Sequence, residues 1–272
     1  MKLGLFEHHN PQLPVLTPYQ VAAIRMLASG LIMLPFAYKA LKQVPKDLLK
    51  FAVLSGLLGS FFPAFLFCIA ETKIGGGIAG SLNALTPLFV IIVGTFFFKL
   101  VTTTQKILGV LVGFFGSAVL VYANMQGQIV NDTPYLLFVI LATFLYGINV
   151  NMVIKKLSGV PSLQIAAIAF SSLIIPSIII LYNSGYFSLE LSQTKYIVAT
   201  AAASVLGVIG TALASILFYM LMKRAGGIFA STVTYGIPFV AIAWGLIHHE
   251  HLTFIHLIGL IIILGGVYLS GK

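Results

Sequence analysis

Two short polar stretches interrupt an apolar chain, and a proline closes each of them. The residues concerned are Asn83, Thr86, Pro87, Thr234, Tyr235 and Pro238. A proline lacks the backbone N–H, so a helical carbonyl about one turn earlier loses its donor. Polar side chains and free carbonyls in the middle of a membrane can hydrogen-bond a polar solute. The pattern predicts substrate binding at two helix breaks, although the same groups could instead join helices, with the prolines only bending them.

Four more residues could contribute to such a site: Arg25, Glu71, Tyr146 and Asn149. Tyr146 and Asn149 lie one turn apart on one helix face, where they either line a cavity or bond a neighbouring helix. Arg25 lies inside an apolar segment and could pair an anionic group such as a carboxylate, but it is also close enough to a helix end to snorkel. Glu71 could serve proton coupling or could simply be a solvated helix end.

Composition places these residues in a membrane protein. Hydrophobic residues make up 59% of the 272 residues and charged residues only 8%, against about 25% charged in soluble domains. The net charge of +9 does not form a basic stripe with interleaved aromatics, so no nucleic-acid partner is expected. Residues 75–80 lack the Gly-Lys-Ser/Thr of a phosphate-binding loop, and the His-His-Glu-His run at 248–251 lacks the order His-Glu-x-x-His. No cofactor, metal site or catalytic residue is predicted.

Nine apolar stretches approach the length of about 20 residues that spans a bilayer. They lie at 18–38, 50–70, 77–98, 106–123, 134–154, 162–182, 196–222, 227–247 and 252–270. Thr17 and Pro18 suit the N-cap and first residue of the first helix. Alternate loops hold 11 of the 15 basic residues, and the positive-inside rule makes that side cytoplasmic. The sequence therefore predicts an all-α, multi-pass membrane protein with a cytoplasmic C-terminus.

The chain contains one pattern twice, in predicted repeats at 1–124 and 134–272. Gly75, Gly76 and Pro87, for example, return 151 positions later as Gly226, Gly227 and Pro238. The loop charges reverse between matched positions, so the second repeat is expected to be inverted in the membrane. Ten helical residues rise about 15 Å from each matched loop, which would bring Asn83 and Thr234 together at the bilayer centre.

Ordered motifs along the chain carry a family resemblance. They are Arg25, the Gly-rich run at 75–79 with Pro87, Tyr146-Gly147-Ile148-Asn149, Glu250-His251-Leu252-Thr253, Gly259 and Gly265-Gly266-Val267. In this order they resemble the EamA family of the drug/metabolite transporter superfamily, which implies ten helices in two inverted repeats. The apolar stretch at 135–154 has no counterpart before Met1, so the first helix is expected to be missing, which leaves nine.

The resemblance implies a secondary-active permease or exporter of a small metabolite, such as an amino acid or nucleobase, that works by alternating access. It also implies proton coupling and a multi-pass location in a plasma membrane, here a bacterial inner membrane, and leaves a homodimer open. Two alternatives stand beside it: a truncated fragment that cannot transport, and an integral-membrane lipid-modifying enzyme. Six scattered acidic residues do not favour the enzyme.

Two pairs of glycines spaced four residues apart predict close helix packing. They are Gly76 with Gly80, and Gly109 with Gly113. Small residues at this spacing let two helix backbones approach each other inside a membrane.

Overall fold

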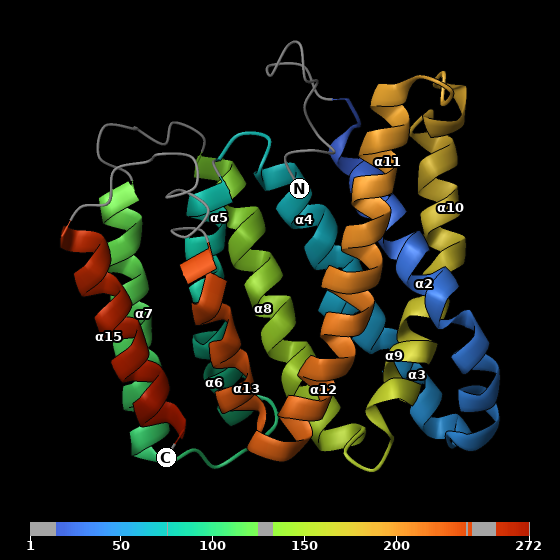
Figure 1. Ribbon diagram of the computed structural model, residues 1–272. Helices are drawn as coiled ribbons and strands as arrows, with labels where there is room; N and C mark the ends of the chain where they lie inside the picture. Colours follow the sequence, from blue (N-terminus) through green and yellow to red (C-terminus); the bar gives the residue numbers. More distant parts are fainter. Residues whose placement is uncertain (1–14, 75, 125–132, 238, 241–253, 272) are drawn as a thin grey trace. The chain divides into compact units, whose positions relative to one another are not determined.

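The computed structural model describes residues 15–74, 76–124, 133–237, 239–240 and 254–271, and every regular element in these ranges is helical (Figure 1). Seven helices in the described ranges are long and apolar enough to cross a membrane, and Thr104–Leu120 is a shorter apolar helix. The all-α prediction is therefore confirmed, and the predicted spans differ from the observed ones by a few residues at their ends. The expected helix at 227–247 is described only as far as residue 240.

The chain divides into two compact units, and each contains helices from both halves of the sequence. The first unit holds the described residues up to Ile69 together with Lys156–Met220, and the second holds Ala70–Lys155 together with the described residues from Leu221. In the first unit, α2 (Pro18–Gln43) packs against α9 (Ser162–Ser171), α10 (Ile174–Asn183) and α11 (Thr194–Gly207), and α3 (Lys46–Gly56) packs against α9.

Helix α2 begins where the sequence predicts. The Thr17 side chain accepts a hydrogen bond from the Gln20 N–H, and the Gln20 side chain accepts one from the Thr17 N–H. This reciprocal capping box satisfies two of the N–H groups that a helix start leaves unpaired. The Gln20 Nε2 also donates to the Ser184 carbonyl at 2.9 Å, so one side chain both caps α2 and ties it to the end of α10.

Two π-helical segments occupy matched positions in the two halves. The first, η1 (Leu57–Phe61), joins α3 to α4 (Phe62–Ala70), and the second, η4 (Val208–Leu213), joins α11 to α12 (Ala214–Ala225). Each follows a glycine that touches the backbone of a neighbouring helix: Gly56 meets Ala169, and Gly207 meets Arg25. The two sequence repeats therefore share a local distortion as well as a residue pattern.

The second unit is held together by glycine contacts between α7 (Thr104–Asn124) and α15 (Phe254–Gly271), which lie side by side (Figure 1). A Cβ on Gly266 would meet the Gly113 backbone, one on Gly109 would meet the Ser270 backbone, and one on Gly116 would lie 2.8 Å from the Ile263 nitrogen. The packing prediction for Gly109 and Gly113 is confirmed.

The corresponding prediction for Gly76 is wrong, because a Cβ there would meet no atom within 4 Å. Gly76 begins α5 (Gly76–Leu82) and is exposed. Its partner in the motif, Gly80, does make a contact, since a Cβ there would lie 3.0 Å from the Ile237 side chain.

Adjacent glycines on α15 allow a matched test of this packing. Gly266→Ala inserts a methyl group against the Gly113 backbone, and overpacking of this kind costs about 1–3 kcal/mol. Gly265→Ala points into open space and should be neutral or stabilising by up to about 1 kcal/mol, because alanine is the better helix former. Unfolding in dodecyl maltoside titrated with SDS measures both changes. Equal stability of the two variants would contradict the packing role of Gly266.

Candidate functional site

The two polar stretches form breaks in two helices. The chain changes from α5 to a 3₁₀ segment, η2 (Asn83–Leu85), before α6 (Thr86–Phe96), and from α13 (Gly227–Ser231) to a second 3₁₀ segment, η5 (Thr232–Gly236). Each 3₁₀ segment ends close before the proline of its stretch, and Pro238 itself lies outside the described residues. The two segments contact each other, so the sequence correctly predicted that the stretches meet.

The first break is held by its own polar side chains. Asn83 is 8% exposed and Thr86 is 2% exposed. The Thr86 hydroxyl donates to Asn83 Oδ1 at 3.0 Å. This bond fixes the orientation of the Asn83 amide and leaves its Nδ2 group as the remaining donor, for which the described residues supply no hydrogen-bond acceptor.

At the second break, the hydroxyl groups of both candidate residues are hydrogen-bonded. The Thr234 hydroxyl donates to the Ser231 carbonyl at 2.9 Å. The Tyr235 ring is completely buried against Gly113, and its hydroxyl donates to the Val110 carbonyl at 2.8 Å. These contacts anchor η5 to α7. The prediction that Thr234 and Tyr235 bind substrate stays a prediction.

Helix α8 (Thr133–Lys156) carries the polar group with the fewest partners. Asn149 is 3% exposed, and its Oδ1 has no hydrogen-bond donor among the described residues. Tyr146, one turn earlier, is partly buried and makes a contact of its own. A buried acceptor without a donor costs about 1–3 kcal/mol, so Asn149 is a polar group that the fold itself does not use.

Asn151 is a second buried asparagine on α8, and the sequence did not identify its role. Its Nδ2 donates to the Val90 carbonyl at 2.9 Å and to the Gly147 carbonyl at 2.8 Å. A Cβ on Gly94 would lie 2.7 Å from Asn151 Oδ1, and one on Gly147 would lie 2.9 Å from the Phe89 carbonyl carbon. Glycines on both helices thus let α6 and α8 approach, and Asn151 bonds across the contact.

The predicted cation Arg25 lies in the first unit, beside η4. Its Nη2 donates to the Thr211 hydroxyl at 3.3 Å, while its buried Nε has no acceptor among the described residues. The Thr211 hydroxyl also contacts the Leu206 carbonyl at 3.3 Å, five residues earlier. The π-helical segment therefore places Thr211 against the guanidinium group.

Glu71 follows α4 in a turn, is partly buried and has an interaction partner. The histidine run at 248–251 lies outside the described residues. Within the described ranges, no group of three or more His, Cys, Asp or Glu residues is placed to hold a metal ion.

The long apolar helices define a polytopic membrane protein. The model of the EamA-like transporter family matches residues 12–122 and 133–271. The chain belongs to this family, and it is a membrane transporter of the drug/metabolite type.

The fold is also found among solved structures. One of these, titled "Crystal structure of protein", is 17% identical and has a TM-score of 0.69; the match covers 94% of this chain and 87% of that one. At this identity the likeness shows the fold alone. A comparison with curated proteins gave no match.

The bonds of Asn151 predict a structural role that can be measured. Asn151→Leu leaves the Val90 carbonyl without a side-chain donor and forces a branched side chain against Gly94. We expect the free energy of unfolding to fall by about 1–3 kcal/mol, measured by SDS titration in detergent micelles. Val139→Ala, a truncation at another buried position on α8, gives the reference cost of a cavity. An SDS titration curve identical to that of the unmodified protein would contradict the role of Asn151.

Proposed function

We propose that this protein is a secondary-active transporter, a permease or exporter, of a small metabolite such as an amino acid or a nucleobase. Transport proceeds by alternating access of the two inverted repeats. Each compact unit contains helices from both repeats, so the two units would be the bodies that move. The substrate contacts the polar groups at the helix breaks and on α8.

The buried, unpartnered oxygen of Asn149 is the observation that carries this proposal. The other asparagines among these buried groups have bonds that account for their presence: Asn83 accepts from Thr86, and Asn151 bonds two carbonyls. Asn149 Oδ1 has no such bond from any of the described residues. Polar groups are costly inside a membrane and are retained there mainly for function. A substrate that brings an N–H or O–H group would satisfy this oxygen.

The same reasoning defines the substrate chemistry more closely. Asn149 offers an acceptor, and the Asn83 amide offers a donor because its oxygen is already occupied by Thr86. Both groups are neutral. A solute with both donors and acceptors and little net charge fits them, which is the chemistry of nucleobases and of zwitterionic amino acids.

The environment of Arg25 favours a substrate that carries an anionic group. Its Nε is buried without an acceptor among the described residues, and its bond to Thr211 is long at 3.3 Å. A carboxylate can accept two parallel bonds from a guanidinium group. We infer that Arg25 pairs the carboxylate of an amino-acid substrate, and that Glu71 takes part in proton coupling.

We also propose a plasma-membrane location, in a bacterial inner membrane, with the C-terminus in the cytoplasm. The proposed location rests on the family. The proposed orientation rests on the placement of 11 of the 15 basic residues in alternate loops, which favours retention of those loops on the inner side.

Asn149→Leu tests the proposal. Removing an unsatisfied buried group should leave the melting temperature unchanged or raise it, because the leucine has no polar group to bury. Uptake should fall at least about fivefold, since a substrate donor then lacks its acceptor. The measurement uses proteoliposomes with a pH gradient and a mixture of the proteinogenic amino acids and nucleobases, with the contents quantified by mass spectrometry.

Two results would contradict this account. Unchanged uptake in a stable Asn149→Leu variant would remove Asn149 from the site. No uptake of any solute by the unmodified chain, in either direction of the gradient, would favour the transport-incompetent alternative. Asn151→Leu is the control with the opposite pattern. It should lower the free energy of unfolding, whereas Asn149→Leu should lower uptake without lowering stability.

Arg25→Lys separates anion binding from snorkelling. Lysine retains the charge and can snorkel, but it cannot make the paired bonds of a guanidinium group. The apparent KM for amino acids should rise by about tenfold, while nucleobases, which have no carboxylate, should be unaffected. An equal effect on both classes of solute would assign Arg25 a structural role with Thr211.

A further inference from the structure

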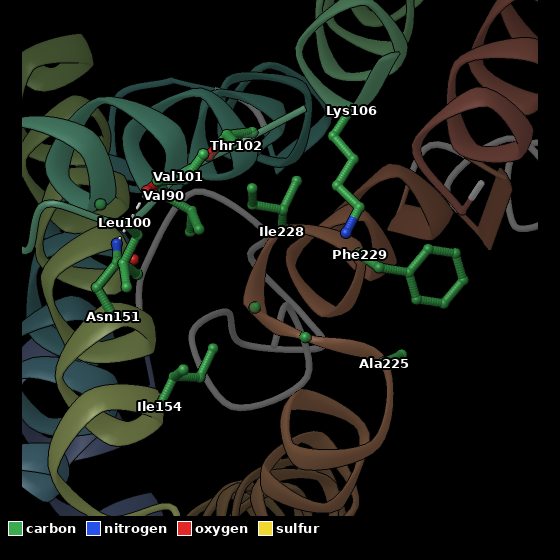
Figure 2. A pocket seen from close by; sticks show the side chains of 13 residues that line it. Val90, Leu100, Val101, Thr102, Lys106, Asn151, Ile154, Ala225, Ile228 and Phe229 are labelled. Carbon is green, nitrogen blue, oxygen red and sulfur yellow. Dashed lines mark hydrogen bonds between the residues drawn. The ribbon is translucent and has the colours of Figure 1, made fainter. Parts of the chain in front are cut away.

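A pocket lies in the second unit, and no residue of the two 3₁₀ segments lines it. Figure 2 shows it enclosed by the loop between α6 and α7, the last turns of α8 and the start of α13, with Lys106 running toward Ile228 and Phe229. Its volume is about 160 Å³, roughly ten times the minimum that holds one water molecule. Thr102, Lys106 and Asn151 supply its polar side chains. The pocket can therefore accept a polar group of several atoms.

The surroundings of this pocket are basic. Six cations lie on the lining or within two residues of it along the chain: Lys99, Lys106, Lys155, Lys156, Lys223 and Arg224. None of the described residues that line the pocket is acidic. The acidic residue that the structure describes in this unit, Glu71, precedes α5, at the far end of the α5–η2–α6 segment. That segment, residues 76–96, is about 30 Å long, so Glu71 does not neutralise these charges.

Lys106 is available for a ligand. It lies in the first turn of α7 and is partly buried, and none of the described residues forms a hydrogen bond or ion pair with its ammonium group. Lys155 differs, because its Nζ donates to the Phe98 carbonyl at 2.6 Å. One lysine therefore fixes the loop, and the other offers an unused charge to the pocket.

The loop that forms the pocket wall is held in a defined shape. The Leu100 N–H donates to the Gly94 carbonyl at 2.9 Å, and Lys99 adopts a φ of 52°. A left-handed conformation is uncommon for a residue with a side chain, so local bonds must hold it. Together with the Lys155 bond to Phe98, they make the pocket a preformed part of the fold.

Large apolar side chains are exposed beside the pocket. Phe96 is 77% exposed, Phe97 is 73% exposed, and the pocket-lining Val101 is 100% exposed. Exposed apolar side chains such as Phe can bury themselves at the boundary between the lipid headgroups and the acyl chains. Basic pockets between membrane helices bind anionic headgroups, and each nearby lysine or arginine attracts an anionic leaflet.

We propose that this pocket binds a phosphate group, and that an anionic phospholipid supplies it. The Lys106 ammonium and the Thr102 hydroxyl donate to the phosphate oxygens, while the acyl chains lie against Phe96, Phe97 and Val101. These exposed apolar side chains favour a lipid over free phosphate, which has no apolar part to bury. The site is separate from the proposed substrate site and does not depend on it.

The test measures lipid binding directly. Dioleoylphosphatidylglycerol is titrated into the full chain in a neutral detergent, and the bound lipid is quantified by native mass spectrometry. Lys106→Gln should weaken binding at least about tenfold, because it removes a charge-assisted hydrogen bond. Lys39→Gln removes the same charge from an exposed position on α2 outside the pocket and should weaken binding no more than about fivefold.

One further variant and a competition measurement complete the test. Lys106→Arg keeps a cation and should retain most of the binding, which shows that loss in Lys106→Gln does not come from misfolding. Equal losses in Lys106→Gln and Lys39→Gln would overturn the site, leaving only general attraction to an anionic surface. Inorganic phosphate that competes for the pocket with the same affinity as the lipid would overturn the assignment of a lipid. Transport is not measured, so failure here leaves the proposed function untouched.

Discussion

Close approach of helix backbones is the constraint on which the rest of this structure depends. Inside a bilayer no water drives helices together, and small residues at the contacts let the backbones pack. Glycines provide this contact repeatedly: Gly113 with Gly266 between α7 and α15, Gly56 with α9, and Gly207 with α2. A side chain at any of these positions would separate the helices. Hydrogen bonds between helices then fix their relative orientation. The Ser29 hydroxyl of α2, for example, donates at 2.8 Å to the Gly207 carbonyl of α11.

Close packing also explains why the unsatisfied oxygen of Asn149 is informative about function. At Asn151 and Tyr235, neighbouring glycines bring a backbone carbonyl within reach of the side chain, and the bonds are made. Asn149 lies two residues from Asn151 on the same helix and is equally buried, but none of the described residues donates a hydrogen bond to its oxygen. An amide oxygen needs a donor, and in membrane helices the backbone N–H groups are already used within the helix. Only a side chain or a bound molecule can supply one.

The sequence predicted the helices well and the local contacts less well. Apolar runs mark the spans because the bilayer sets their length, so Pro18–Gln43 and Phe254–Gly271 were expected within a few residues of their ends. The two π-helical segments were visible only as a repeated pattern, because a change of helical register depends on contacts with other helices. The sequence identified Asn149 as a candidate from its one-turn spacing to Tyr146. The role of Asn151 became visible only in the structure, which places Gly94 and Gly147 at the contact that Asn151 bonds across. At Gly76 the sequence predicted a contact that the structure lacks, because a small-residue motif does not reveal whether a helix lies opposite.

Helix α8 connects the neutral and the basic parts of the second unit. Asn149 and Asn151 are separated by about 3 Å along the helix axis. Asn149 carries the oxygen that we propose accepts a hydrogen bond from a solute, and Asn151 lines the basic pocket while it bonds α6. A phosphate held by Lys106 and Thr102 would bridge the α6–α7 loop and α7 next to this bond. It would thereby stabilise the arrangement of α6 and α8 in which the pocket exists, because a ligand favours the conformation that binds it by its difference in affinity. Since the same helix carries Asn149, lipid at the membrane surface and solute nearer its middle would act on one structural element.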